Sequence, residues 1–278
     1  MSADSRVEYE YNPHVHVPDV AAYVEAAARA SQQARERIEG IYDVAYGDEP
    51  RMTCDIFPAG PDAPVHVFVH GGYWRGRDKA DYSFMAPAFL DAGVTLVLPT
   101  YGLCPTVDLA TIVRQIADFL GWLPERIGDY GGDPQRITAS AHSAGAHLVA
   151  MAHAADRQPP ARRGGVRAAV LISGLYDLLP VTQTTVNADI GLTPETAREL
   201  SPQYHPPSAE LPLHLMAGGG ETRSWIAQSR TFFEQLQRAG HPVEFDVVGE
   251  HDHYSIAAEL GDPDSPVTRA CMDVVRRY

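Results

Sequence analysis

At 278 residues the chain is long enough for one large α/β domain or two small ones, and its formal charge of −14 argues against nucleic-acid or anionic-membrane surfaces, which need clustered Lys and Arg. Three scattered cysteines exclude a disulfide framework, and without a Cys-x-x-Cys pair they do not predict a zinc site. Because the sequence shows neither a secretory leader nor a run of about 18 apolar residues, we expect a soluble, cytoplasmic protein.

The first predicted element is an amphipathic helix over about Pro18 to Glu39, in which Val20, Tyr23 and Val24 share one face and Gly40 ends the pattern. After it, short β-rich runs alternate with helical ones. The predicted strands are Ile41 to Tyr46, Met52 to Phe57, Val65 to Val69, Val94 to Pro99, the run at Ile137, Ala168 to Ser173, Leu213 to Ala217 and Val243 to Val248. The predicted helices span about Tyr82 to Ala92, Asp108 to Gly128, Ser143 to Ala155 and Ser224 to Ala239, with one more at the C-terminus.

Strands separated by roughly 10 to 20 helical residues indicate right-handed crossovers. The pattern therefore predicts an α/β fold with a mostly parallel central sheet of about eight strands and helices on both faces. No composition break or repeat divides it, so we expect an N-terminal helical extension, residues 1–40, and one catalytic domain, residues 41–278. In such a sheet, ligands bind beyond the carboxyl ends of the strands, which makes the residues after each strand the candidates for a site.

The third predicted strand is followed by His70-Gly71-Gly72-Tyr73-Trp74. Two glycines allow the backbone to approach a bound atom and to turn its N–H groups toward it, as the oxyanion hole of an HGGG-type hydrolase requires. The alternative is an ordinary glycine turn in a loop.

The fifth predicted strand is followed by Ala141-His142-Ser143-Ala144-Gly145. A nucleophile elbow, G-x-S-x-G, needs small residues two before and two after the serine, because the strand and helix approach closely there. Ser143 alone could equally be a helix N-cap. We favour a nucleophile because both motifs follow strands of one predicted sheet, where an oxyanion loop and an elbow belong.

The elbow requires an acid and then a histidine further along the chain. Glu221, after the glycines 218–220 that follow the seventh strand, is the favoured acid, and Asp177, after the sixth strand, is its competitor. The glycine run could also form a phosphate cradle, but it matches no phosphate-binding fingerprint.

His251 and His253 compete for the base, and His253 is favoured because it lies furthest along the loop before the last helix. A metal site at His251-Asp252-His253 is the other interpretation, although no further His or Cys cluster is present to complete it.

Five motifs carry a resemblance: H-G-G-Y-W (70–74), H-S-A-G-A-H-L (142–148), S-G-L-Y-D-L (173–178), G-G-x-E (218–221) and D-H-Y (252–254). Together they resemble the arylformamidase, or kynurenine formamidase, branch of the α/β-hydrolases and its bacterial esterase relatives. The sequence departs from that pattern at Ala141, where the family usually has glycine, and at Gly102, where similar bacterial sequences have aspartate. The second departure lies near the expected pocket and bears on the substrate.

By that resemblance Ser143 is the nucleophile, Glu221 the acid and His253 the base, in a cofactor-free and metal-free hydrolysis of a short acyl amide or ester. The expected oxyanion donors are the N–H groups of Gly72, Tyr73 and Ala144. The expected substrate-binding residues are His70, Gly71, Trp74, His142 and Tyr101. The sequence leaves open a short-chain carboxylesterase, an acyltransferase or a non-catalytic binding protein, and also a homo-oligomer.

Overall fold

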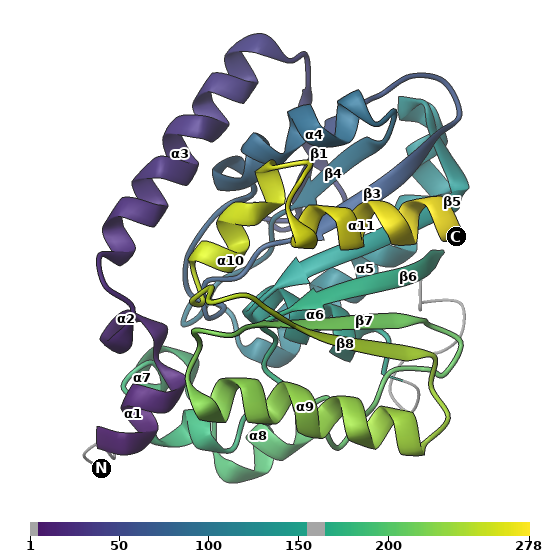
Figure 1. The fold of residues 1–278 in the computed structure, drawn as a ribbon. Coiled ribbons are helices and arrows are strands. Elements are labelled where there is room, and N and C mark those ends of the chain that lie inside the picture. Colours follow the sequence, from purple (N-terminus) through teal and green to yellow (C-terminus); the bar gives the residue numbers. More distant parts are fainter. Residues whose placement is uncertain (1–4, 155–164) are drawn as a thin grey trace.

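A central sheet of eight strands runs through the computed structural model, which describes residues 5–154 and 165–278 (Figure 1). Its order is β1-β2-β4-β3-β5-β6-β7-β8, and every pairing among β3 to β8 is parallel. β2 runs antiparallel to both β1 and β4. The strands are β1 (Ile41–Ala45), β2 (Thr53–Phe57), β3 (Ala63–Val69), β4 (Thr95–Pro99), β5 (Gly132–His142), β6 (Val166–Ile172), β7 (Leu213–Gly218) and β8 (Val243–Val248). The predicted size and mostly parallel character of the sheet are confirmed.

Helices surround this sheet, and none of those within residues 5–154 and 165–278 has the length and hydropathy of a membrane span. The α-helices are α1 (Ser5–Tyr11), α2 (Pro13–His16), α3 (Val20–Arg37), α4 (Ala86–Asp91), α5 (Leu109–Arg126), α6 (Ala144–Ala152), α7 (Asn187–Ile190), α8 (Pro194–Glu199), α9 (Arg223–Arg238), α10 (Ser255–Ala258) and α11 (Pro266–Arg277). Short 3-10 segments are η1 (Lys79–Met85), η2 (Ile127–Tyr130), η4 (Pro180–Gln183) and η5 (Glu259–Gly261).

Two predicted helices have different bounds in the structure. The predicted helix Tyr82–Ala92 is divided into the 3-10 segment η1 and the short α4, which has Pro87 in its first turn. Because proline has no N–H to donate and restricts the residue before it, the chain restarts there as a new helix. The predicted helix Ser143–Ala155 corresponds to α6, which ends at Ala152. The predicted end at Ala155 lies outside the described residues.

Buried apolar side chains form one cluster on each face of the sheet. On one face α5, α6 and α9 cover strand residues that include Val65 and Val67. On the other face η1, α4 and α11 cover strand residues that include Phe68 and Val170. Because side chains alternate along a strand, β3 contributes to both clusters. The sheet is thus fixed from both sides, and the loops after its strands are held on a rigid support.

The N-terminal helices α1, α2 and α3 lie along one side of the sheet (Figure 1). Arg35 of α3 forms an ion pair with the buried carboxylate of Asp55, and Lys79 at the start of η1 lies 3.7 Å from the same carboxylate. The boundary predicted at residue 40 falls between α3 and β1. The division into an extension and a catalytic domain stays a prediction.

Candidate active site

The turn between β5 and α6 contains Ser143 in an unusual backbone conformation, with φ 57° and ψ −121°. Positive φ is uncommon for residues other than glycine and costs energy, so such a position is a candidate for function. Gly145 makes the turn possible, because a Cβ atom there would lie 2.1 Å from the carbonyl oxygen of Val69. The small residue that the motif requires after the serine therefore has a direct steric cause.

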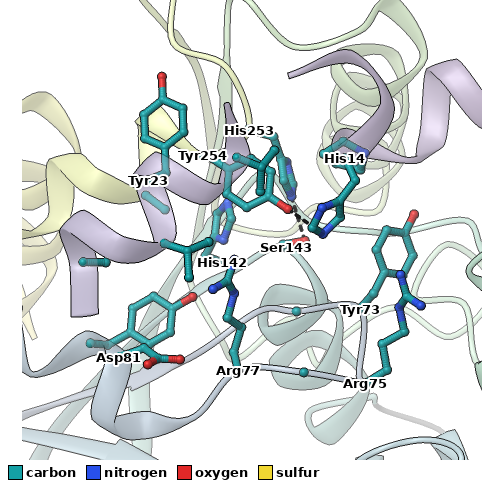
Figure 2. Close-up of a pocket in the computed structure, with 18 of the residues that line it drawn as sticks. His14, Tyr23, Tyr73, Arg75, Arg77, Asp81, His142, Ser143, His253 and Tyr254 are labelled. Atoms are coloured by element: carbon teal, nitrogen blue, oxygen red, sulfur yellow. Dashed lines mark hydrogen bonds between the residues drawn. The ribbon is translucent and has the colours of Figure 1, made fainter. Parts of the chain in front are cut away.

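Ser143 occupies the N-cap position of α6, yet its side chain makes no capping hydrogen bond. Its Oγ instead lies 2.9 Å from Nε2 of His253 (Figure 2). Nδ1 of the same imidazole lies 2.6 Å from Oε1 of Glu221. The structure thus brings together the three side chains that the sequence selects as nucleophile, base and acid, at the carboxyl edge of the sheet.

All three side chains are buried, and burial sets their electrostatics. Burial raises the pKa of Glu221, because the carboxylate loses its hydration, while Ser173 Oγ and the Gly218 N–H, at 2.8 and 2.9 Å from Oε2, stabilise the ionised form. Burial lowers the pKa of His253, because the imidazolium would also be desolvated. A neutral imidazole whose Nε2 faces a hydroxyl is suited to accept its proton.

The glycine run 218–220 holds the acid loop against the histidine loop. A Cβ atom at Gly218 would lie 2.1 Å from the His251 carbonyl oxygen, one at Gly219 would lie 2.0 Å from that of Gly249, and one at Gly220 would lie 2.5 Å from that of Glu250. The Gly220 N–H also donates to the His251 carbonyl at 3.0 Å. These glycines therefore pack backbone against backbone, which places Glu221 beside His253.

The competing acid and histidine have other contacts. Asp177 Oδ1 accepts a hydrogen bond from the Leu179 N–H at 3.0 Å, as a local loop cap does. His251 is about a quarter exposed, and its Nε2 lies 4.0 Å from Glu259. Within the described residues, no group of three or more His, Cys, Asp or Glu side chains is arranged to hold a metal ion.

The loop after β3 approaches the elbow closely, since a Cβ atom at Gly71 would lie 3.0 Å from Cβ of Ser143. Gly72 and Tyr73 both have positive φ, 112° and 52°. The N–H groups of Gly72, Tyr73 and Ala144 donate no hydrogen bond to any residue within 5–154 and 165–278. Within the described chain, these three predicted donors therefore have no acceptor that would compete with a bound oxygen.

A cavity of about 780 Å³ opens over Ser143 and His253 and is lined by His142, as expected for a substrate-binding residue. Four other residues expected to bind substrate are buried and are not among those that line the cavity: His70, Gly71, Trp74 and Tyr101.

The contacts of these four residues explain why they do not line the cavity. The Trp74 ring is fully buried and packs edge-on against His147, with ring centroids 4.8 Å apart. The His70 ring stacks on Tyr101 at 4.4 Å, and the Tyr101 hydroxyl donates to the His70 carbonyl at 2.7 Å. These side chains pack beneath the loop after β3. The left-handed backbone at Tyr73 and Trp74 turns the Trp74 ring into the core.

The departure at Gly102 also has a structural cause. A Cβ atom there would lie 2.6 Å from Val107 and 2.9 Å from Oε1 of Gln115, which accepts a hydrogen bond from the Gly102 N–H at 2.7 Å. A side chain at this position would therefore require Val107 and Gln115 to shift. Cys104 and Pro105, two and three residues later, do line the cavity.

Sequence reasoning missed most of the cavity wall. The wall includes His14 from α2, Tyr23 and Val24 from α3, Arg75 and Arg77 from the loop after β3, Tyr82 and Phe84 from η1, and Tyr254 beside His253 (Figure 2). The apolar face of α3 was the available signal, but it indicates a buried face without saying what lies opposite. Aromatic rings are frequent in this wall, as they are in small-molecule pockets generally.

Residues 57–236, more than half of the chain, match a family model described as BD-FAE. Kynurenine formamidase from Danio rerio is 28% identical over 289 aligned residues, covering 99% of this chain and 97% of that protein. Kynurenine formamidase from Drosophila melanogaster is also 28% identical and covers 96% of each chain. Esterase LipQ from Mycobacterium tuberculosis is 30% identical over 71% of this chain, which spans about half, 53%, of that longer protein.

Solved structures give the same picture of the fold. A putative thioesterase from Silicibacter sp. has a TM-score of 0.85 at 26% identity, covering 96% of this chain and 98% of that one. A Pyrobaculum calidifontis esterase has a TM-score of 0.72 at 18% identity, covering 93% and 94%. With the strand order described above, these likenesses confirm the predicted α/β-hydrolase fold.

Proposed function

Since the chain belongs to the BD-FAE family and is a hydrolase, we propose that it is a serine hydrolase that cleaves short acyl amides and esters, with N-formyl arylamines as its preferred class. The observation that carries this proposal is the hydrogen-bonded series from Ser143 through His253 to Glu221, with separations of 2.9 and 2.6 Å. Relatives named kynurenine formamidase and esterase support the choice of amide and ester substrates. The proposed binding partner of the protein is accordingly its small-molecule amide or ester substrate.

The first half of the reaction forms an acyl enzyme. Ser143 Oγ attacks the carbonyl carbon while Nε2 of His253 takes its proton, and Glu221 stabilises the imidazolium that results. His253 then gives this proton to the leaving nitrogen or oxygen, which departs with the bonding electrons. Water, deprotonated by the same imidazole, hydrolyses the acyl enzyme and restores Ser143.

The developing oxyanion is stabilised by backbone donors. The N–H groups of Gly72, Tyr73 and Ala144, which have no partner among the described residues, are proposed to donate to it. One such donor is worth about 3 to 4 kcal/mol when it is well placed. Because these donors are fixed by the loop and the start of α6, they need no rearrangement when charge develops.

A short-chain carboxylesterase is the second candidate, and LipQ and the esterase structures favour it. Both candidate functions predict that the part of the cavity that holds the acyl group is narrow. Tyr73, whose hydroxyl donates to the Tyr11 carbonyl, is held beside the predicted oxyanion donors and limits the space there. Trp74 packs into the core instead, so the restriction rests on Tyr73.

Chain length should therefore decide the rate among esters. Between 4-nitrophenyl acetate and octanoate, we expect kcat/KM to fall, with about 1 to 3 kcal/mol lost for each methylene that the site cannot accommodate. N-formylkynurenine should be hydrolysed in the same assay. If octanoate were the best ester, the narrow acyl side would be wrong, and if the formamide were not hydrolysed while acetate was, the protein would be an esterase. Product analysis with an added alcohol distinguishes hydrolysis from acyl transfer.

The pH dependence tests the histidine. Protonated His253 cannot accept the Ser143 proton, so activity should be lost as the pH falls through the pKa of this imidazole. Because burial lowers this pKa from the ordinary value of 6.5, we expect kcat/KM to be flat above neutrality and to fall only below pH 6.5. The fall of kcat/KM at acidic pH is measured in a pH profile with N-formylkynurenine as the substrate. A midpoint above pH 7 would contradict the buried, neutral base.

A further inference from the structure

The loop after β3 places two arginines in the wall of the cavity, although the chain as a whole carries a formal charge of −14. Arg75 is already neutralised, since its Nη1 lies 2.6 Å from Oδ2 of Asp189. Arg77 differs: no carboxylate of residues 5–154 and 165–278 lies within ion-pair distance of its guanidinium. The cavity therefore contains one cation without a counter-ion among the described residues.

The acidic side chains that line the same cavity are used elsewhere. Asp189 pairs with Arg75, and Glu25 pairs with Arg29 on the next turn of α3 at 3.4 Å. Asp81 accepts a hydrogen bond from the Asp78 N–H at 3.1 Å and so caps η1. Within the described chain, none of these carboxylates forms an ion pair with Arg77.

The backbone holds Arg77 in place. Its φ is 74°, a left-handed conformation that is uncommon for an arginine, and Nη2 of Arg51 donates to its carbonyl at 3.0 Å. Arg51 is itself paired with Asp78 at 3.1 Å. Backbone strain that is maintained by neighbouring contacts occurs preferentially at active sites and ligand-binding positions.

The Arg77 side chain extends into the cavity toward His142 and Tyr254 (Figure 2). Tyr254 follows the base His253 in the chain, and its hydroxyl also contacts Nε2 of His14 at 3.0 Å. Burial lowers the pKa of His14, and the positive charges of Arg75 and Arg77 lower it further, so His14 does not compete as a cation at neutral pH. Arg77 thus places a cation that has no ion-pair partner within the described chain beside Tyr254, the residue after His253.

The leaving group of the substrate must lie on that side, because it receives its proton from Nε2 of His253. We infer that Arg77 binds a carboxylate carried by the leaving-group part of the substrate. A guanidinium and a carboxylate match in charge and in planar geometry, and the aromatic rings of Tyr82 and Tyr254 line the same cavity as Arg77 and Ser143. This inference rests on the proposed hydrolase function and narrows its substrates to anionic arylamides or aryl esters.

The test compares two acetate esters that differ in one charge, 3-acetoxybenzoate and phenyl acetate. The measured quantity is the ratio of their kcat/KM values in the wild type, Arg77→Gln, Arg77→Lys and Arg75→Gln. The loss of a charge-assisted hydrogen bond should lower the ratio about tenfold or more in Arg77→Gln. Arg77→Lys, which keeps the charge, should retain part of the preference, and Arg75→Gln, which removes an arginine already paired with Asp189, should leave the ratio within about twofold.

If Arg77→Gln lowered kcat/KM equally for both esters, the inference would be overturned, because Arg77 would then only support the loop. An unchanged ratio would overturn it as well. Calorimetric titration with 3-hydroxybenzoate, the product of the anionic ester, tests the same contact without catalysis, and Arg77→Gln should weaken its binding about tenfold. If neither ester nor any formamide were hydrolysed, the proposed function would fail, while the titration would still decide whether Arg77 binds the carboxylate.

Discussion

Replacing Ser143 by alanine is expected to lower kcat by about 10⁴-fold or more while the protein still folds. The reaction loses its nucleophile, and the residual rate can come only from substrate binding and the oxyanion donors. Folding should be little affected, because the hydroxyl makes one hydrogen bond, to His253, and caps nothing in α6. Alanine also leaves the close approach at Gly145 unchanged.

Two measurements check this prediction. Thermal unfolding of Ser143→Ala should resemble that of the wild type, which separates loss of chemistry from loss of structure. A phosphonate ester that labels serine hydrolases should add its mass to the wild type and not to the variant. A folded variant that kept a tenth of the activity would remove Ser143 from the mechanism.

The second large effect separates the true acid and base from their neighbours in the sequence. Glu221→Gln and His253→Ala should each lower kcat by about 10³-fold or more, because the imidazole loses its orientation in the first and is absent in the second. Asp177→Asn and His251→Ala are the matched controls and should stay within a few-fold of the wild type. Asparagine keeps the oxygen that accepts from Leu179, and the glycine loop contacts the backbone of residue 251 rather than its side chain.

All four variants are compared by kcat with one substrate and by thermal unfolding. Activity lost in Asp177→Asn and kept in Glu221→Gln would assign the acid to the loop after β6. The corresponding reversal between His251→Ala and His253→Ala would assign the base to the other histidine. Either result would contradict the hydrogen bonds that join Ser143, His253 and Glu221.

The positions of the candidate nucleophile, acid and base could be predicted because each depends on local constraints. A serine flanked by small residues after a β-run is typical of a nucleophile elbow. Gly145 is visible in the sequence because its close contact with Val69 excludes any larger residue. The choice of Glu221 over Asp177 likewise follows from the glycines before it, which allow two loops to touch. The sheet was predictable because alternation of strands and helices restricts the topology.

Side-chain direction in the loop after β3 could not be predicted in the same way. Along a strand, alternation tells which residues face inward, but Tyr73 and Trp74 both have left-handed backbone, where that rule does not apply. One ring therefore lines the cavity while the next is fully buried. The role of α3 was also hidden, since an amphipathic pattern does not identify the distant residues that it will contact.

The contacts between the N-terminal helices and the histidine loop affect the order in which the molecule assembles. Tyr23 donates to Asp252 across 229 positions of sequence, and His14 meets Tyr254 across 240. Joining such distant segments costs more chain entropy than closing the short crossovers of the sheet, so we expect these contacts to form late. During synthesis the first helices emerge long before their partners exist. The wall of the cavity is therefore completed last, and a chain can have its sheet and its elbow in place before it has a binding site.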